Sequence, residues 1–323
     1  MSFVRSPLPH ARITALHPAE GRALCGGDLG IQPLLLECHG LVGVPWDPVA
    51  LHRVRYVGEP VAVAWGRDRY EAEDAVEATR VDYESLPKAT PIHEEVPDGV
   101  LYAAAYDSGG FEIAAASAAA IIEGSFKSAR QSALPMECRG VAATHDSGTG
   151  VTTVWTSTQI PHLVRRGIAL GLGVDERTIR VVVPHVGGGF GLKAHLFAEE
   201  IAVAALARRI QRPVRWIEDR WENLIGSVHA HDTTITMRVA VRDDGTFLGV
   251  DADVVADVGA YSVWPFSASL EPATAAASLF GPYAIGAIKY RAQGVALATV
   301  ARSAHIGGWE STPASMPPSG SWM

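Results

Sequence analysis

Hydrophobic residues near the N-terminus follow patterns that predict two strands and a helix. Residues 61–65 are all apolar and follow the turn-like sequence Gly58-Glu59-Pro60, which favours a buried strand. Asp68 can cap a helix whose apolar residues recur at helical spacing, and residues 79–84 then alternate as a half-buried strand would. Strand, helix and strand in this order predict a small α/β unit within residues 1–95.

A second group of elements is predicted from about residue 119 onward. Residues 151–157, 178–183 and 214–218 read as strands, and Pro161 opens a helix between the first two. A longer helix should bury Ile201, Ala204 and Ala205 and end before Pro213. Residues 233–241 and 248–255 alternate around an Asp-Asp-Gly turn and predict a hairpin. Residues 88–118 show no clear period, so we predict a linker at 96–118 between two domains.

Composition narrows the class of protein. The chain has 323 residues and a formal net charge of −8, which argues against a nucleic-acid partner because such proteins need a basic face. The longest apolar runs, such as residues 113–122, are too short to span a bilayer, and no signal-peptide pattern is visible. Cys25, Cys38 and Cys138 form no CxxC pair, which predicts reduced thiols rather than zinc or iron–sulfur ligands. We therefore predict a cytoplasmic protein.

The run of glycines from Gly187 to Gly191 is the sharpest local candidate for a binding site. Glycines between a strand and a helix let the backbone approach a ligand closely and donate hydrogen bonds from its amides. The spacing is neither GxGxxG nor GxxxxGK[ST], so the two phosphate-binding loops are disfavoured. A tight turn that packs a helix onto a sheet remains an alternative.

Other polar residues carry weaker signals. Gln159 follows a predicted strand and, by position alone, favours a surface or capping role. Glu137 and Arg139 flank Cys138 and either pair with each other or are solvated. The histidines show no metal-ligand spacing, so we assign no metal to His185, His195, His229 or His231.

Together, these segments resemble the large, molybdopterin-binding subunits of the xanthine dehydrogenase, aldehyde oxidase and carbon monoxide dehydrogenase family. Arg5-Ser6-Pro7, His10-Ala11-Arg12-Ile13 and residues 54–62 and 70–87 resemble the α/β hammerhead domain of that family. Pro135-Met136-Glu137, residues 155–159, 186–191, 212–216, 259–261 and 281–283, and Lys193 resemble the first part of its molybdenum-cofactor domain. The resemblance implies an α+β fold: a hammerhead domain at 1–95, the linker at 96–118 and a partial cofactor-binding domain at 119–297.

The resemblance also implies a function. Family members are oxidoreductases that oxidise an aldehyde, a heterocycle or a similar carbon centre, with water as the oxygen source. It places Gln159 near an oxo ligand of molybdenum, and Gly188, Gly189, Phe190 and Gly191 around the metal–dithiolene end of the cofactor. The implied cofactor is molybdopterin as its cytosine dinucleotide. The implied partners are an FAD-binding medium subunit and a small subunit with 2Fe-2S clusters, and the substrate is a small molecule. Purine-oxidising relatives have a glutamate where this chain has Ala194, which disfavours xanthine.

The chain also departs from the family. Relatives have at least one strand before the Arg-Ser-Pro motif, and they continue for several hundred residues beyond the end of this sequence. The part that follows in relatives contains the glutamate that acts as general base. We therefore expect a truncated fragment that lacks this glutamate and is inactive. Residues 298–323 stop resembling the family and are either a native tail or the product of a shifted reading frame. Re-reading residues 302–308 in another frame can give the family motif Tyr-Arg-Gly-x-Gly. The alternative function is a stable, non-catalytic remnant that acts as a binding module.

Overall fold

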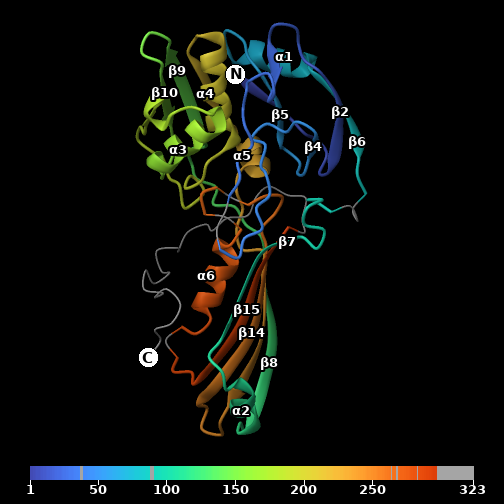
Figure 1. Cartoon of the computed structure of the whole chain (residues 1–323), viewed down its shortest axis with the longest axis vertical. Helices are drawn as coiled ribbons and strands as arrows, with labels where there is room; N and C mark the ends of the chain where they lie inside the picture. The colour runs from blue at the N-terminus through green and yellow to red at the C-terminus, as the bar shows by residue number, and fades with distance from the viewer. Residues whose placement is uncertain (37–38, 88–90, 263, 267, 282, 297–323) are drawn as a thin grey trace.

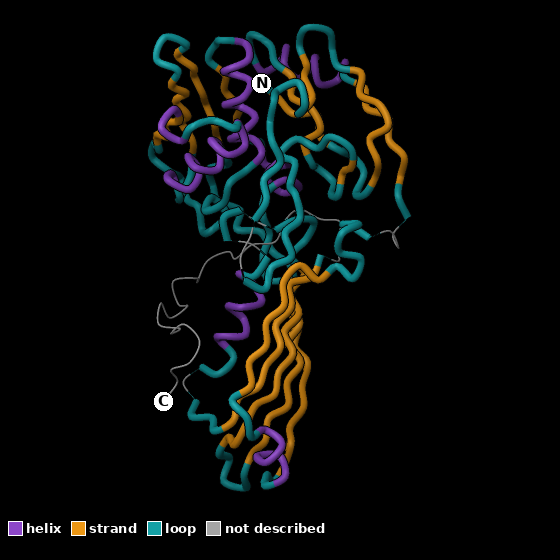
Figure 2. Tube along the Cα trace, in the orientation of Figure 1, coloured by secondary structure: helices purple, strands orange, loops and turns teal. Residues whose placement is uncertain are grey.

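The computed structural model describes residues 1–36, 39–87, 91–262, 264–266, 268–281 and 283–296. Their elements form three packed units, which are an N-terminal unit, a four-stranded unit and a long five-stranded sheet (Figure 1). The first two lie side by side at one end of the molecule, and the five-stranded sheet extends away from them (Figure 2). The mixed helix-and-sheet fold expected from the sequence is confirmed.

The N-terminal unit (residues 1–87) contains two antiparallel three-stranded sheets, with strand orders β1-β5-β3 and β4-β2-β6. Its elements are β1 (Ser2–Arg5), β2 (Ala11–His17), β3 (Ala23–Cys25), β4 (Arg53–Val54), β5 (Pro60–Ala64), α1 (Arg69–Ala78) and β6 (Arg80–Ser85). Every residue of β5 is buried, as its unbroken apolar run predicts. The Asp68 side chain caps α1 by accepting a hydrogen bond from the Glu71 amide at 3.0 Å.

The four-stranded unit (residues 132–229) has the strand order β11-β10-β9-β12. Its elements are β9 (Gly140–Asp146), β10 (Val151–Thr156), α3 (Pro161–Leu172), the 3-10 helix η1 (Glu176–Thr178), β11 (Ile179–Val182), α4 (Ala198–Ile210), β12 (Val214–Ile217) and α5 (Arg220–Gly226). The long helix α4 packs on the sheet and on α3, and it buries Ile201, Ala204 and Ala205 as predicted. Gly171 of α3 permits the close approach of the two helices, because a Cβ there would lie 3.0 Å from a methyl carbon of Ile201.

The five-stranded sheet has the order β7-β15-β14-β13-β8 and forms the elongated end of the molecule (Figure 1). Its elements are β7 (Val100–Asp107), α2 (Phe111–Ala116), β8 (Ala120–Ser128), β13 (Thr233–Val241), β14 (Phe247–Asp257), α6 (Leu270–Ser278) and β15 (Ala287–Val295). The hairpin expected around the Asp-Asp-Gly turn is present as β13 and β14. Helix α6 covers part of one face, where Ala276 packs against Val254 and Ala292.

The segment predicted to be a linker, residues 96–118, is instead part of this sheet. It forms β7, which pairs with β15, and α2, which packs on β13, β14 and β15. Leu101 and Phe111 are buried at 0% and 2% exposure, so they belong to cores rather than to a solvated connection. The sequence hides this because β7 has no alternating pattern and its partner strand lies far away along the chain.

The four-stranded unit is an insertion within the five-stranded sheet. Strands β8 and β13 pair directly, and the chain between them leaves and returns where Gln131 and Ala230 exchange two backbone hydrogen bonds of 3.0 Å. One hydrophobic cluster joins the inserted unit to the N-terminal unit, since Phe3, Trp46 and Val63 pack with residues such as Val154 and Ile201. Among the described residues, no helix is long and apolar enough to cross a membrane.

Candidate functional site

The glycine run lies between β11 and α4 and forms a compact exposed loop. Gly188 and Gly191 adopt φ angles of +94° and +88°, which favour glycine, and Phe190 between them has φ +51°. Two short turns close the loop, from the Leu192 amide to the Gly189 carbonyl at 2.9 Å and from the Ala194 amide to the Gly191 carbonyl at 3.0 Å. The Phe190 side chain is 62% exposed. The loop therefore presents backbone and one aromatic ring at the surface of this chain.

Gln159 lies directly against this loop. Its backbone amide donates to the Lys193 carbonyl at 2.9 Å, which ties the end of β10 to the end of the loop. A Cβ added to Gly189 would lie 2.4 Å from Gln159 Oε1 and 2.6 Å from its Cδ. Only glycine at position 189 leaves room for the carboxamide, so the structure brings together the two features that the sequence singled out.

Glu137 anchors the start of the loop. One of its carboxylate oxygens, Oε2, accepts hydrogen bonds from the Gly187 amide and from Lys193 Nζ, the latter at 2.8 Å. The Lys193 side chain is completely buried, whereas the Glu137 side chain is 39% exposed. Burial alone would raise the pKa of Glu137, but the hydrogen bonds from Lys193 and Gly187 lower it overall. Lys193 was part of the sequence resemblance, but its partner could not be inferred from sequence spacing.

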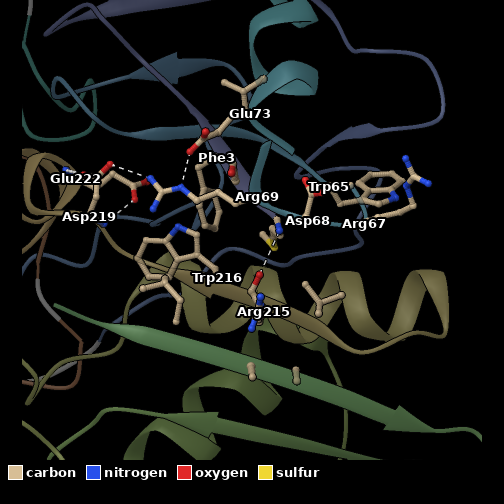
Figure 3. A pocket seen from close by; sticks show the side chains of 18 of the residues that line it. Phe3, Trp65, Arg67, Asp68, Arg69, Glu73, Arg215, Trp216, Asp219 and Glu222 are labelled. Carbon is tan, nitrogen blue, oxygen red and sulfur yellow. Dashed lines mark hydrogen bonds and ion pairs between the residues drawn. The ribbon is translucent and has the colours of Figure 1, made fainter. Parts of the chain in front are cut away.

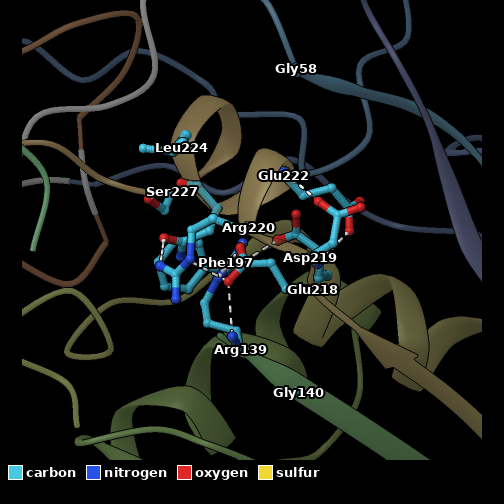
Figure 4. A network of polar contacts seen from close by, with 12 residues as sticks. Gly58, Arg139, Gly140, Phe197, Glu218, Asp219, Arg220, Glu222, Leu224 and Ser227 are labelled. Atoms are coloured by element: carbon cyan, nitrogen blue, oxygen red, sulfur yellow. Dashed lines mark hydrogen bonds and ion pairs between the residues drawn. The ribbon is translucent and has the colours of Figure 1, made fainter. Parts of the chain in front are cut away.

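Arg139 belongs to a buried ion cluster, and Figure 4 shows its side chain reaching toward the Glu218 side. Its guanidinium binds Glu218 at 2.9 Å through Nε and Glu199 at 3.1 Å through Nη1, and it stacks 3.6 Å from the centre of the Phe197 ring. Arg5 of β1 adds contacts of 2.9 Å to both Glu199 and Glu222. Neither alternative considered for Glu137 and Arg139 is observed, since each pairs with residues distant in the sequence. The cluster fixes the start of α4 relative to β9 and the N-terminal unit.

Two adjacent glutamates at the start of α4 have opposite shifts in acidity. Burial would raise the pKa of Glu199, but Arg139 and Arg5 lower it to about 2, so it is a carboxylate. For Glu200, burial raises the pKa to about 7. Glu200 accepts hydrogen bonds from Thr156 Oγ1 at 2.8 Å and from the Phe197 amide at 3.0 Å. Glu200 therefore links the end of β10, which precedes Gln159, to the first turn of α4.

A groove of about 1090 Å³ separates the N-terminal unit from the four-stranded sheet (Figure 3). Its walls include four tryptophans, namely Trp65, Trp155, Trp216 and Trp221. Arg69 bridges Glu73 at 2.6 Å and Asp219 at 3.5 Å, and the Met1 amino group donates to the Arg215 carbonyl at 3.2 Å. Neither Gln159 nor the glycine loop lines this groove, so it is a separate feature from the site predicted from the sequence.

Comparison with known proteins identifies the family. Residues 92–311 match the family model of the molybdopterin cofactor-binding domain. The chain belongs to this family. It is 33% identical over 314 residues to the nicotine 6-hydroxylase large subunit of Paenarthrobacter nicotinovorans, a match that covers 90% of this chain and 38% of that protein. It is 30% identical over 312 residues to the carbon monoxide dehydrogenase large chain of Hydrogenophaga pseudoflava, covering 87% of this chain and 38% of that one.

A solved structure supports the same assignment. Quinoline 2-oxidoreductase from Pseudomonas putida 86 matches with a TM-score of 0.87 and 33% identity, covering 94% of this chain and 41% of that chain. This member of the molybdopterin cofactor-binding domain family thus spans about two fifths of the length of these three relatives. The predicted kinship with molybdenum hydroxylase large subunits is confirmed.

The residues present fit a molybdopterin group. The glycine loop packs tightly on Glu137 and Gln159, because a Cβ at Gly187 would lie 2.7 Å from Glu137 Cβ and a Cβ at Gly189 would lie 2.4 Å from Gln159 Oε1. Backbone amides and a carboxamide can hydrogen-bond to oxygen atoms of a ligand without adding charge. Among the described residues, no group of His, Cys, Asp or Glu could hold a metal ion directly. The roles of the individual site residues remain predictions.

Proposed function

We propose that this chain is the molybdopterin-binding part of a molybdenum-dependent hydroxylase. The observation that carries the proposal is the contact between the Gln159 carboxamide and Gly189, inside a chain of the molybdopterin-binding family. Gly188, Gly189, Phe190 and Gly191 would surround the metal–dithiolene end of the cofactor. Gln159 would orient an oxygen ligand through its carboxamide, which can both donate and accept hydrogen bonds. The cofactor supplies the redox chemistry when bound.

The proposed architecture follows the resemblance. Residues 1–95 correspond to the hammerhead domain, and residues 119–297 correspond to the first part of the cofactor-binding domain. Two small antiparallel sheets with one packed helix support a separate α/β unit at the N-terminus. Residues 298–323, for which a shifted frame was considered, lie outside the described residues.

For the whole protein, we propose oxidation of an aldehyde, a heterocycle or a similar carbon centre with water as the oxygen source. Relatives named for nicotine and quinoline support a heterocyclic substrate. We also propose the cytosine dinucleotide form of the cofactor, partner subunits with FAD and 2Fe-2S clusters, and a cytoplasmic location. The general base is assigned to no residue of this chain, so the isolated chain should bind cofactor without turnover.

Gly189→Ala tests the proposal. The chain is expressed in a bacterial host that makes molybdopterin, and molybdenum and pterin are measured per purified chain. The added methyl group displaces the Gln159 carboxamide, so both contents should fall by about tenfold, equivalent to about 1.4 kcal/mol of binding energy. Gly27→Ala is the matched control, because its new Cβ would meet other atoms only at 3.8 Å or more. Equal, background-level contents in the wild-type chain and both variants would favour the non-catalytic remnant.

A further inference from the structure

The two ends of the glycine loop meet at one carboxylate oxygen. Gly187 opens the loop and Lys193 follows it, and both donate hydrogen bonds to Glu137 Oε2. A second bond joins the same segments, from the Glu137 amide to the Gly187 carbonyl at 3.3 Å. The Glu137 carboxylate therefore joins the two ends of the loop through hydrogen bonds.

Lys193 connects this closure to Gln159. At the side-chain end its ammonium binds Glu137, and at the backbone end its carbonyl accepts from the Gln159 amide at 2.9 Å and from Thr158 Oγ1 at 3.1 Å. A displacement of Lys193 would thus move the end of β10 together with the loop. Lys193 therefore couples the Glu137 ion pair to the backbone that carries Gln159.

The opposite charges of Lys193 and Glu137 favour the one loop conformation in which the two side chains meet. The Lys193 side chain has no solvent exposure, and a buried ammonium without a counter-charge is strongly destabilising. Any loop conformation that separates Lys193 from Glu137 leaves this ammonium without its counter-charge. Two neutral side chains at these positions could separate without leaving a buried charge unpaired. The ion pair therefore favours the closed conformation of the loop over open ones.

We propose that Glu137 and Lys193 form a clamp that positions the glycine loop against Gln159. Glu137 is a positioning residue, because it acts through the Gly187 amide and Lys193. The consequence for cofactor binding rests on the function proposed above, whereas the effect on loop conformation does not. Removing either charge should let the loop open, and removing both should relieve the penalty of the unpaired ammonium.

Hydrogen–deuterium exchange on the chain without added cofactor tests the clamp. Glu137→Gln keeps the shape of the side chain and removes its charge, and Lys193→Met keeps the aliphatic stem and removes the ammonium. We expect Glu137→Gln to accelerate exchange of the loop amides by about tenfold relative to the rest of the chain. The double variant should exchange more slowly than Glu137→Gln alone, because it lacks the unpaired ammonium that Glu137→Gln leaves buried.

Glu176→Gln is the matched control. Glu176 pairs with Arg165 in the same four-stranded unit and has a similar side-chain exposure of 37%, so its substitution should leave loop exchange unchanged. Additive effects in the double variant, or acceleration spread equally over the whole chain, would overturn the clamp. Molybdenum content of the same samples is measured separately. Hydrogen–deuterium exchange therefore tests the clamp, and the molybdenum content of the wild-type chain separately tests the proposed function.

Discussion

Charged side chains of the four-stranded unit are neutralised in very different surroundings. Arg139 and its carboxylate partners are almost fully buried, whereas the Arg177–Asp175 pair has side chains that are 89% and 47% exposed. Water screens an exposed pair, so its contribution to stability is small. In a buried cluster, removing one partner leaves a charge that neither water nor protein can compensate. The Arg139 cluster should therefore dominate the response to charge removal.

Arg139→Met should destabilise the chain by about 3–5 kcal/mol, because buried Glu218 loses its counter-charge and buried Glu199 keeps only Arg5. The change is measured as the free energy of unfolding in urea, followed by tryptophan fluorescence. Arg177→Met is the exposed control and should produce no measurable change. Equal effects of the two substitutions would show that burial of the Arg139 cluster is not what makes it important.

Among individual residues, the sequence predicts Gln159 and the glycine loop as parts of the site but not the ion pairs around them. The resemblance pointed to Gln159 and the glycine loop, and the structure places them in contact. The binding partners of Glu137 and Arg139 could not be predicted, because Lys193 and Glu218 reach them only after the sheet and α4 have folded. Pairing across such distances leaves no spacing signal in a single sequence.

Elements with strong local signals were predicted well. Helix α1 is capped by Asp68, and helix α3 begins at Pro161. Helix α4 ends at Ile210, before Pro213, as the sequence predicts. Strand β7 has no such signal, so the sequence predicts a linker there. Its structure comes from pairing with β15 and from contacts with the chain near Gly40. Tertiary pairing therefore decides the conformation of this segment.

A proline substitution distinguishes a strand from a linker at β7. The Ala103 amide donates to the Gly40 carbonyl, so by alternation the Ala104 amide faces β15, where Ala104 pairs with Ala292. Ala104→Pro removes this donor and should lower the free energy of unfolding by about 2 kcal/mol or more.

The neighbouring Ala105 supplies the control for this experiment. Its amide faces away from β15, a position at which a strand tolerates proline better, so Ala105→Pro should be the milder change. Thermal unfolding of the two variants, followed by circular dichroism, gives the comparison. If Ala104→Pro left the transition unchanged, the segment would behave as a linker after all.

Over the whole molecule, the units are joined by a polar network as well as by a shared hydrophobic core. Tyr261 donates to Glu59 Oε1 at 2.7 Å and accepts from Arg55 Nη1 at 2.9 Å, and Arg55 also binds the Ile92 carbonyl at 2.9 Å. Glu59 is 1% exposed, and burial raises its pKa from 4.5 to about 7. The contact between the N-terminal unit and the remainder of the chain thus contains a carboxyl group that titrates near neutrality.

This network predicts a pH dependence of stability. Between pH 4.5 and 7 the folded chain holds a proton on Glu59 that the unfolded chain has lost, so the stability contributed by this group falls as pH rises. From pH 5 to pH 8 the unfolding free energy of the wild type should therefore fall by on the order of 3 kcal/mol relative to that of Glu59→Gln.

Subtracting the unfolding free energy of Glu59→Gln from that of the wild type removes the pH dependence of titratable groups that both proteins share. His93 is one of these, because burial lowers its pKa to about 4 and so gives the opposite dependence at acidic pH. Urea unfolding at a series of pH values supplies the curve. A difference that stays constant with pH would mean that Glu59 does not change its protonation in this range.

The inserted position of the four-stranded unit sets an order of events during synthesis. The segment between Gln131 and Ala230 forms its sheet from its own residues, and it packs on the N-terminal unit, which is made earlier. Strand β8 must wait for β13, and β7 must wait for β15, so their pairing closes long loops and is slow. The glycine loop and Gln159 should therefore acquire their arrangement on the ribosome while two strands of the long sheet still have unpaired edges.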